Sequence, residues 1–273
     1  MDLINKILSS VFNILFLPFK NVDPVWAMLA ISAVTGVVML LVFKATSDQA
    51  GIKRAKNLVK GHFLAIRLYK DDIGLMLDTM KNIISSNLLY MKQSLRPMLF
   101  LMVPVGIVLI QLGIRYEFRP LRTGERVVVT LGVADDSVEL SEVELILPAG
   151  LVAEMPPVRI EQVREVNWRI RAEKAGVFTL SFKYGDKVVE KRLQIVDSLV
   201  PITAQIASHD LGITLMNPAE ASLPSGSFAS VVSILYPKRE AEFWGITMHW
   251  LVAFFVFSLI VAFGLKGTLG VEV

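Results

Sequence analysis

Thioether side chains are concentrated in residues 76–102, and their chemistry is the first functional hint in this sequence. Met76, Met80 and Met91 fall in a polar, proline-free segment, and Met98 and Met102 follow where the chain becomes apolar. A thioether is flexible and polarisable, so a surface built from it adapts to many apolar shapes. The pattern therefore favours either a surface that meets varied hydrophobic partners or ordinary packing between two helices.

Groups that make or break bonds are scarce. The chain has no cysteine, which excludes disulfides, thiolate metal ligands and cysteine nucleophiles. Its histidines (His62, His209, His249) form no ligand pair at helical spacing, so we expect no metal site. Phosphate-cradling glycine loops, His-Glu-x-x-His and Gly-x-Ser-x-Gly are absent. We expect a protein that is not an enzyme, has no cofactor and takes no small-molecule substrate. A net charge of +3 also argues against nucleic-acid sequence readout.

Three apolar stretches are long enough to cross a bilayer. They lie within residues 24–44, 97–115 and 244–265, and the cores of the first two carry no charged side chain. A helix needs roughly 20 residues to cross about 30 Å of hydrocarbon, and it satisfies its backbone polar groups internally. The sequence therefore predicts an α-helical membrane protein with three transmembrane helices.

Within residues 1–20, apolar residues recur near helical spacing, and Pro18 follows the last of these positions. This pattern predicts an amphipathic helix in the plane of the membrane interface, rather than a cleaved signal peptide. Lys and Arg are frequent in residues 45–96, and basic residues in a short loop mark the cytoplasmic side. We therefore expect a prokaryotic inner-membrane protein with its N-terminus outside and its C-terminal tail, 266–273, in the cytoplasm. The arginines that follow residue 114 leave the inverted orientation as the alternative.

The segments between the spans differ in their pattern of apolar and polar residues. Residues 45–96 repeat apolar positions three and four apart, with an interruption at Asp71-Asp72, and predict a cytoplasmic helical hairpin. Short alternating runs in residues 116–197 predict an extracytoplasmic all-β sandwich of immunoglobulin-like type. Residues 198–243 are expected to be an extracytoplasmic linker with one β segment, at 228–236.

Two segments carry a resemblance to a known family. Met91–Gly113 (MKQSLRPMLFLMVPVGIVLIQLG) has a basic-Pro-Met opening and a second proline, and Trp250–Val271 has an aromatic start and a Lys-x-x-Leu-Gly ending. With the N-terminal helix and the hairpin, they resemble the YidC/Oxa insertase superfamily. The closest likeness is to its small branch, the archaeal YidC-like proteins and the related insertase subunits of the endoplasmic reticulum. The resemblance covers about 1–115 and 244–273, and the β domain is an addition to the family's pattern.

The resemblance implies a membrane-protein insertase or chaperone. Its partners would be the lipid bilayer and hydrophobic client or partner membrane proteins, with ribosome or translocon contact through the basic hairpin. It also implies client-binding residues, which combine apolar side chains on the hairpin with polar or basic groups near the spans. The candidates for this role are Met76, Met80, Met91, Arg96, Gln111, Arg115 and Ser258.

Other interpretations use the same residues. Small residues such as Ser258 also mark close helix packing in membranes. The whole chain could be a structural or scaffolding subunit of an inner-membrane or envelope complex. A sensor that couples the β domain to the hairpin would need a dimer seam, and no sustained heptad pattern supports one.

Overall fold

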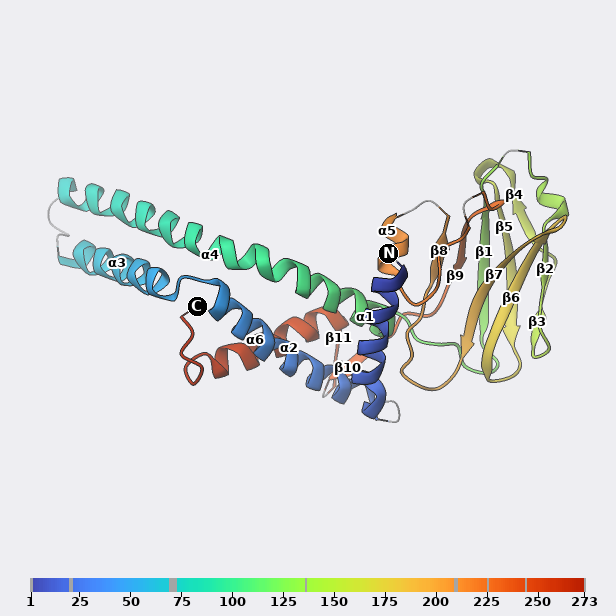
Figure 1. The fold of residues 1–273 in the computed structure, drawn as a ribbon, viewed down its shortest axis with the longest axis horizontal. Helices are drawn as coiled ribbons and strands as arrows, with labels where there is room; N and C mark the ends of the chain where they lie inside the picture. The colour runs from blue at the N-terminus through green and yellow to red at the C-terminus, as the bar shows by residue number, and fades with distance from the viewer. Residues whose placement is uncertain are drawn as a thin grey trace. The chain divides into compact units, whose positions relative to one another are not determined.

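The computed structural model describes residues 2–19, 22–68, 73–135, 137–208, 211–224, 226–243 and 245–272. The chain divides into two compact units, which are described separately here (Figure 1). The β unit comprises Met1–Ala27 and Leu109–Trp250, and the helical unit comprises Met28–Val108 and Leu251–Val273.

The helical unit is formed mainly by four helices. They are α2 (Pro24–Thr46), α3 (Gln49–Leu68), α4 (Ile73–Tyr116) and α6 (Trp250–Leu265). Among the described residues, two helical segments, Pro24–Thr46 and Thr79–Tyr116, are long and apolar enough to cross a membrane. The first agrees with the predicted span over 24–44, and the second contains the predicted span over 97–115 but begins 18 residues earlier. The hairpin turn predicted at Asp71-Asp72 lies outside the described residues.

Helix α4 corrects one predicted boundary. The second arm of the predicted hairpin and the second span were separated after Arg96, where the uncharged apolar stretch begins. The structure has a single helix of 44 residues with Pro97 and Pro104 inside it. Each proline removes one backbone hydrogen bond. Helix-favouring residues on both sides of each proline keep the helix continuous despite the missing hydrogen bonds.

Helix α6 corrects a second boundary. The predicted span over 244–265 is a helix of only 16 residues that begins at Trp250. The residues before it form a hairpin in which β10 (Ala241–Phe243) pairs with β11 (Ile246–Met248). Gly245 has a φ of +84°, a conformation that glycine adopts readily, and it makes the turn. The apolar residues Ile246 and Met248 were therefore assigned to the helix only because of their hydropathy.

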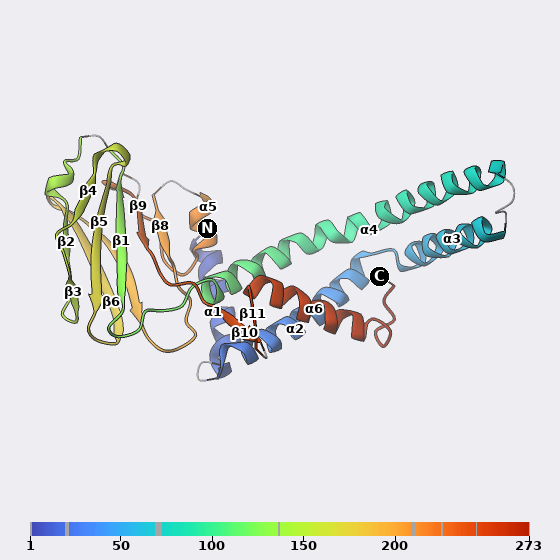
Figure 2. The same ribbon diagram turned by 180° about the vertical axis from the view of Figure 1, so that it is seen from behind.

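Two antiparallel sheets form the main body of the β unit (Figure 1, Figure 2). One has the strand order β3-β5-β1-β9-β8, with β4 also paired to β5, and the other has the order β2-β6-β7. The strand bounds are β1 Arg126–Val133, β2 Glu144–Ile146, β3 Leu151–Ala153, β4 Val158–Ile160, β5 Glu165–Ala172, β6 Gly176–Tyr184, β7 Lys187–Ile195, β8 Gln205–Ala207 and β9 Ala229–Ile234. Short helices join them: η2 Leu140–Glu142, η3 Glu161–Val163 and α5 Leu211–Met216.

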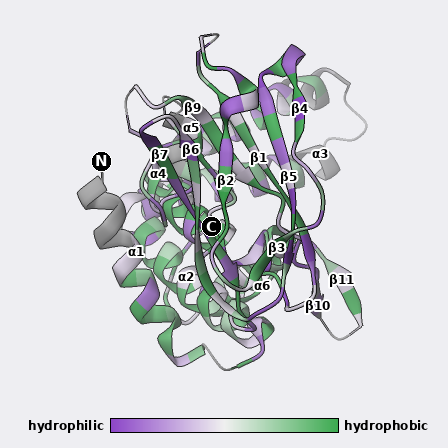
Figure 3. Ribbon diagram, turned by 90° about the vertical axis from the view of Figure 1, so that its right-hand side faces the viewer, coloured by the Kyte–Doolittle hydropathy of each residue, from purple (hydrophilic) through white to green (hydrophobic). Residues whose placement is uncertain are grey.

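One hydrophobic core is shared by both sheets. Alternation of hydrophilic and hydrophobic residues along strands such as β5 places one set of side chains inside (Figure 3). Trp168 of β5 and Phe182 of β6 meet with their ring centroids 5.5 Å apart. Both side chains are buried, so this contact joins the two sheets.

The predicted linker over 198–243 is largely part of this sheet. Strand β9 pairs with β1, and β8 pairs with β9. The predicted β segment is confirmed, since β9 lies inside 228–236. The linker assignment is wrong, because Ile202, Phe228 and Tyr236 are buried in the shared core. The residues between β8 and β9 are polar and rich in proline, so the sequence alone did not indicate that this segment belongs to the sheet.

The N-terminal helix is confirmed in position. Helix α1 covers Asp2–Phe16, and the short helix η1 (Leu17–Phe19) contains Pro18. Phe16 is buried, whereas Val11, Ile14 and Leu17 are exposed.

Candidate functional site

Both arms of the helical unit expose large apolar side chains. On α3 and the first half of α4, eight of them are between 48% and 69% exposed. We call this set the apolar arm surface, and it consists of Leu58, Phe63, Leu64, Leu77, Met80, Ile84, Leu88 and Met91. The five on α4 recur three or four residues apart and so share one face of that helix. Exposed apolar patches of this kind are uncommon on soluble monomers and mark a site that meets another apolar surface.

The predicted methionines can be placed on this surface. Met80 and Met91 are exposed on α4, so in this structure they do not fill a seam between the two arms. The side chain of Met76 lies outside the described residues. Arg96 is exposed on the same helix, five residues after Met91. The hairpin therefore combines apolar and cationic groups that are open to a partner.

A small apolar cavity of 210 Å³ lies between α2 and α6. Gly36 of α2 meets the backbone of α6 so closely that a Cβ there would lie 2.6 Å from the carbonyl oxygen of Ser258. The Ser258 hydroxyl donates a hydrogen bond to the carbonyl of Phe254, at 2.6 Å. Ser258 therefore serves helix packing, and the cavity lining is almost wholly apolar. The other lining residues are Thr35, Met39, Leu40, Phe43, Val105, Phe255, Leu259, Ala262 and Phe263.

The C-terminal residues are bound to the start of the hairpin. Lys44 donates to the carbonyl of Leu269 at 2.6 Å, and the Glu272 amide donates to Gln49 at 2.6 Å. Lys56 and Glu272 form an ion pair at 3.4 Å. The predicted tail is thus anchored at the junction of α2 and α3.

Gln111 and Arg115 lie together in the last turns of α4 and belong to the β unit. Arg115 is 1% exposed, and it donates to both the backbone carbonyl and the side-chain oxygen of Gln111, at 2.8 and 3.0 Å. It also donates to Asn13 of α1 at 2.6 Å, and its guanidinium lies 4.7 Å from the centre of the Phe16 ring. Arg115 therefore attaches the N-terminal helix to α4.

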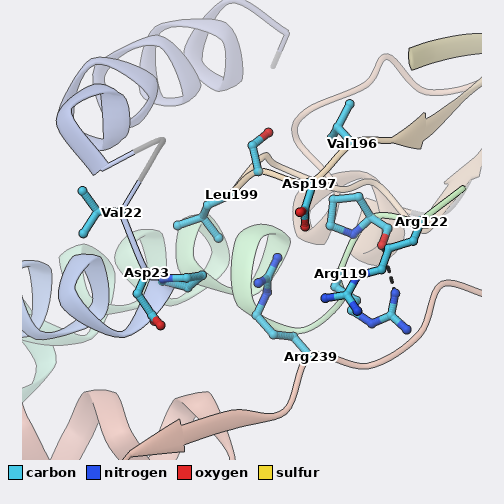
Figure 4. A pocket seen from close by; sticks show the side chains of 11 residues that line it. Val22, Asp23, Arg119, Arg122, Val196, Asp197, Leu199 and Arg239 are labelled. Carbon is cyan, nitrogen blue, oxygen red and sulfur yellow. Dashed lines mark hydrogen bonds between the residues drawn. The ribbon is translucent and has the colours of Figure 1, made fainter. Parts of the chain in front are cut away.

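A larger cavity of 500 Å³ in the β unit is lined by three arginines (Figure 4). Arg119 is bound to Glu125 by two hydrogen bonds of 2.8 Å, which hold the pKa of Glu125 below its ordinary value. Burial lowers the pKa of Arg239, whose Nε lacks a hydrogen-bond partner. Asp23 begins α2 by accepting a hydrogen bond from the Val25 amide.

The charges around this arginine-lined cavity are balanced. Its three cations, Arg119, Arg122 and Arg239, are matched by Asp23, Asp197 and the neighbouring Glu125. A cavity without net charge has no electrostatic preference for an anion over water. We therefore assign it no ligand.

The predicted site residues fall into separate groups. Met80, Met91 and Arg96 are exposed on the hairpin, Ser258 packs against Gly36, and the Gln111–Arg115 pair is buried against α1. The structure does not gather them into one cavity. The sequence analysis did not identify Asn13 or Phe16 as partners of Arg115, although both lie on the helix whose amphipathic pattern was recognised.

No group of three or more His, Cys, Asp or Glu side chains within the described ranges could hold a metal ion. Among known proteins, no family model, no curated sequence and no solved structure matches the chain.

Proposed function

We propose that this chain is a YidC/Oxa-like insertase or chaperone that assists the insertion or assembly of membrane proteins. The observation that carries the proposal is the apolar arm surface, which leaves eight large apolar side chains open on the hairpin. In this proposal α2, α4 and α6 span a prokaryotic inner membrane, the hairpin is cytoplasmic, and the β unit is an extracytoplasmic immunoglobulin-like domain. No chemistry is required of the protein, because insertion changes the environment of a chain and not its covalent bonds.

The apolar arm surface would hold a client segment before it enters the bilayer. An apolar segment that has left the ribosome exposes surface to water, and each buried Å² recovers about 25 cal/mol. Met80 and Met91 suit this task, because an unbranched thioether adapts to clients of different shape. The cationic groups nearby, including Lys81, Lys92 and Arg96, would favour contact with a ribosome or with acidic flanking residues.

The short helix α6 supports a role in lowering the insertion barrier. A helix of 16 residues is about 24 Å long, which is less than the roughly 30 Å of a typical hydrocarbon core. A span that is too short is accommodated by local thinning of the bilayer. Thinning in turn reduces the cost of moving a polar or charged segment across. The exposed apolar face of α1, with Ile14 71% exposed, is suited to lie in the same interface.

Substitution of Met80 and Met91 together by aspartate tests the capture step. Both side chains are exposed, so the double variant M80D/M91D should fold like the wild type. Crosslinking from a photoreactive residue at Leu88 to ribosome-bound membrane-protein chains should fall about tenfold, because a carboxylate pressed against an apolar segment costs on the order of 1 kcal/mol or more. The measurement is the crosslinked fraction of radiolabelled nascent chain.

Ser85→Asp is the control, since it adds the same side chain, once and not twice, at an exposed polar position of the same helix. It should leave the crosslinked fraction within about twofold of the wild type, in keeping with the small effect of surface substitutions. A crosslink to one fixed protein that persists after nascent chains are released with puromycin would contradict insertion and favour a scaffolding subunit.

The proposed orientation can be read by labelling, because the chain has no native cysteine. A membrane-impermeant maleimide should label Ser141→Cys in intact spheroplasts, and should label Ser85→Cys only after the membrane is permeabilised. Both positions are exposed, so accessibility to the reagent depends on the side of the membrane. The opposite labelling pattern would put the hairpin outside and remove the capture step.

A further inference from the structure

A second polar cavity in the β unit has an unbalanced positive charge. It measures 390 Å³, and its walls come from α1, the last turns of α4, β7 and the segments around β8 and α5. Eight of its twelve lining residues have polar side chains, and the lining is formed by Ser9, Ser10, Asn13, Ile114, Arg115, Arg192, Gln194, Pro201, Thr203, Pro218, Ala219 and Glu220. The apolar arm surface contributes nothing to it.

Arg115 brings a buried charge without a counterion to this cavity. It contacts the oxygens of Gln111 and Asn13 and the ring of Phe16, all uncharged. Within the part of the chain that the structure describes, no carboxylate forms an ion pair with it. A buried cation with only neutral partners is costly, and an anion in the adjoining space would offset that cost.

Glu220, the acidic residue of the lining, is already neutralised. Lys191 is fully buried and its ammonium lies 2.7 Å from Glu220 Oε2 and 2.6 Å from the carbonyl oxygen of Thr203. Arg192 lies 3.9 Å from the other oxygen of Glu220. The lining itself holds two cations, Arg115 and Arg192, and one carboxylate, and Lys191, which is outside the lining, pairs with that carboxylate. The cavity therefore has a net positive charge.

An unused hydrogen-bond group lies in the same wall. Thr203 is 2% exposed, and its hydroxyl oxygen has no hydrogen-bond partner. A buried hydroxyl without a partner costs free energy, which a ligand that accepts its hydrogen bond would recover. Ser9 adds a second hydroxyl from α1.

We propose that this cavity binds the phosphate group of an organic phosphate ester. Guanidinium and hydroxyl donors are the groups that bind phosphate oxygens, and the planar guanidinium fits them in pairs. A volume of 390 Å³ exceeds the needs of a bare anion and falls within the range of about 300–1,000 Å³ of small-molecule sites. The ester is either a phospholipid headgroup or a soluble compound. The site does not depend on the proposed insertase function.

Binding to the purified full chain in detergent tests the proposal. The probes are sn-glycerol 3-phosphate, measured by calorimetry, and phosphatidylglycerol, measured by native mass spectrometry against neutral diacylglycerol. Saturable binding of phosphatidylglycerol alone assigns the site to a lipid headgroup, and saturable binding of glycerol 3-phosphate assigns it to a soluble ester. Saturation by neither probe overturns the proposal.

Two conservative variants tie the binding to this cavity. Arg192→Gln should weaken binding about tenfold, because it removes a charge-assisted hydrogen bond. Thr203→Val should weaken it about fivefold without loss of thermal stability, because the hydroxyl has no partner in the protein. Arg171→Gln, a half-exposed arginine outside the cavity, is the control and should bind like the wild type. Equal affinity of all three variants would overturn the assignment to this cavity.

Discussion

Replacing Lys191 with methionine should destabilise the β unit by about 3 kcal/mol. The Lys191 ammonium is wholly buried, and it bonds to Glu220 and to the Thr203 carbonyl. Burial lowers the pKa of Lys191, and Glu220 counteracts that effect. Methionine fills a similar volume but leaves Glu220 with only Arg192 nearby, at 3.9 Å. The loss therefore comes from a largely buried carboxylate that has lost its closest counterion and hydrogen-bond donor, and not from a cavity.

Hydrogen exchange of the β6 and β7 amides measures this loss as a fall in their opening free energy. The double variant K191M/E220Q should recover most of the stability, because removal of both partners leaves no buried charge. Lys187→Met, at the exposed start of the same strand, should change it by less than about 0.5 kcal/mol. A single variant K191M that exchanges like the wild type would show that the ion pair is not formed.

Replacing Gly36 with valine should separate α2 from α6. A Cβ at Gly36 would lie 2.6 Å from the Ser258 carbonyl oxygen, and backbone atoms cannot give way as a flexible side chain does. Overpacking of this kind costs typically about 1–3 kcal/mol, and this contact is at the severe end. In detergent, the variant should melt several degrees lower, and α6 amides should exchange faster.

Gly106→Val in α4 is the matched control, since a Cβ there meets no atom within 4 Å. Both changes replace glycine with valine in an apolar helix, so the change in intrinsic helix propensity is the same in the two variants. Equal melting temperatures for the two variants would contradict the close contact of Gly36 with Ser258.

Local patterns were sufficient to predict many elements from the sequence. The uncharged run of α2 and the alternating runs at 126–134, 163–172, 177–184 and 188–196 indicated α2, β1, β5, β6 and β7 within a few residues of their observed bounds. Each of them is defined by the periodicity of its own side chains. The three-residue strands β3, β4 and β8 are too short to show such a period, and they were missed.

Long-range contacts account for the remaining differences. The assignment of β8 and β9 to the domain depends on pairing with β1, a strand far earlier in the chain. The environment of Arg115 depends on Asn13 and Phe16, which approach it only in the folded chain. The sequence analysis named Gln111 and Arg115 as candidate client-binding residues near the second span. Their burial against α1, and the charge imbalance it creates, required the three-dimensional arrangement.

Insertion into proteoliposomes tests the central claim, that the exposed arms and short helix assist chains into a bilayer. The purified protein is reconstituted, and a single-span client with a short polar tail is synthesised in its presence. Protease protection of the tail should exceed that in empty liposomes and should fall towards the empty-liposome level with M80D/M91D, while S85D retains it. Protection equal to that of empty liposomes, or equal for both variants, would contradict the proposed function.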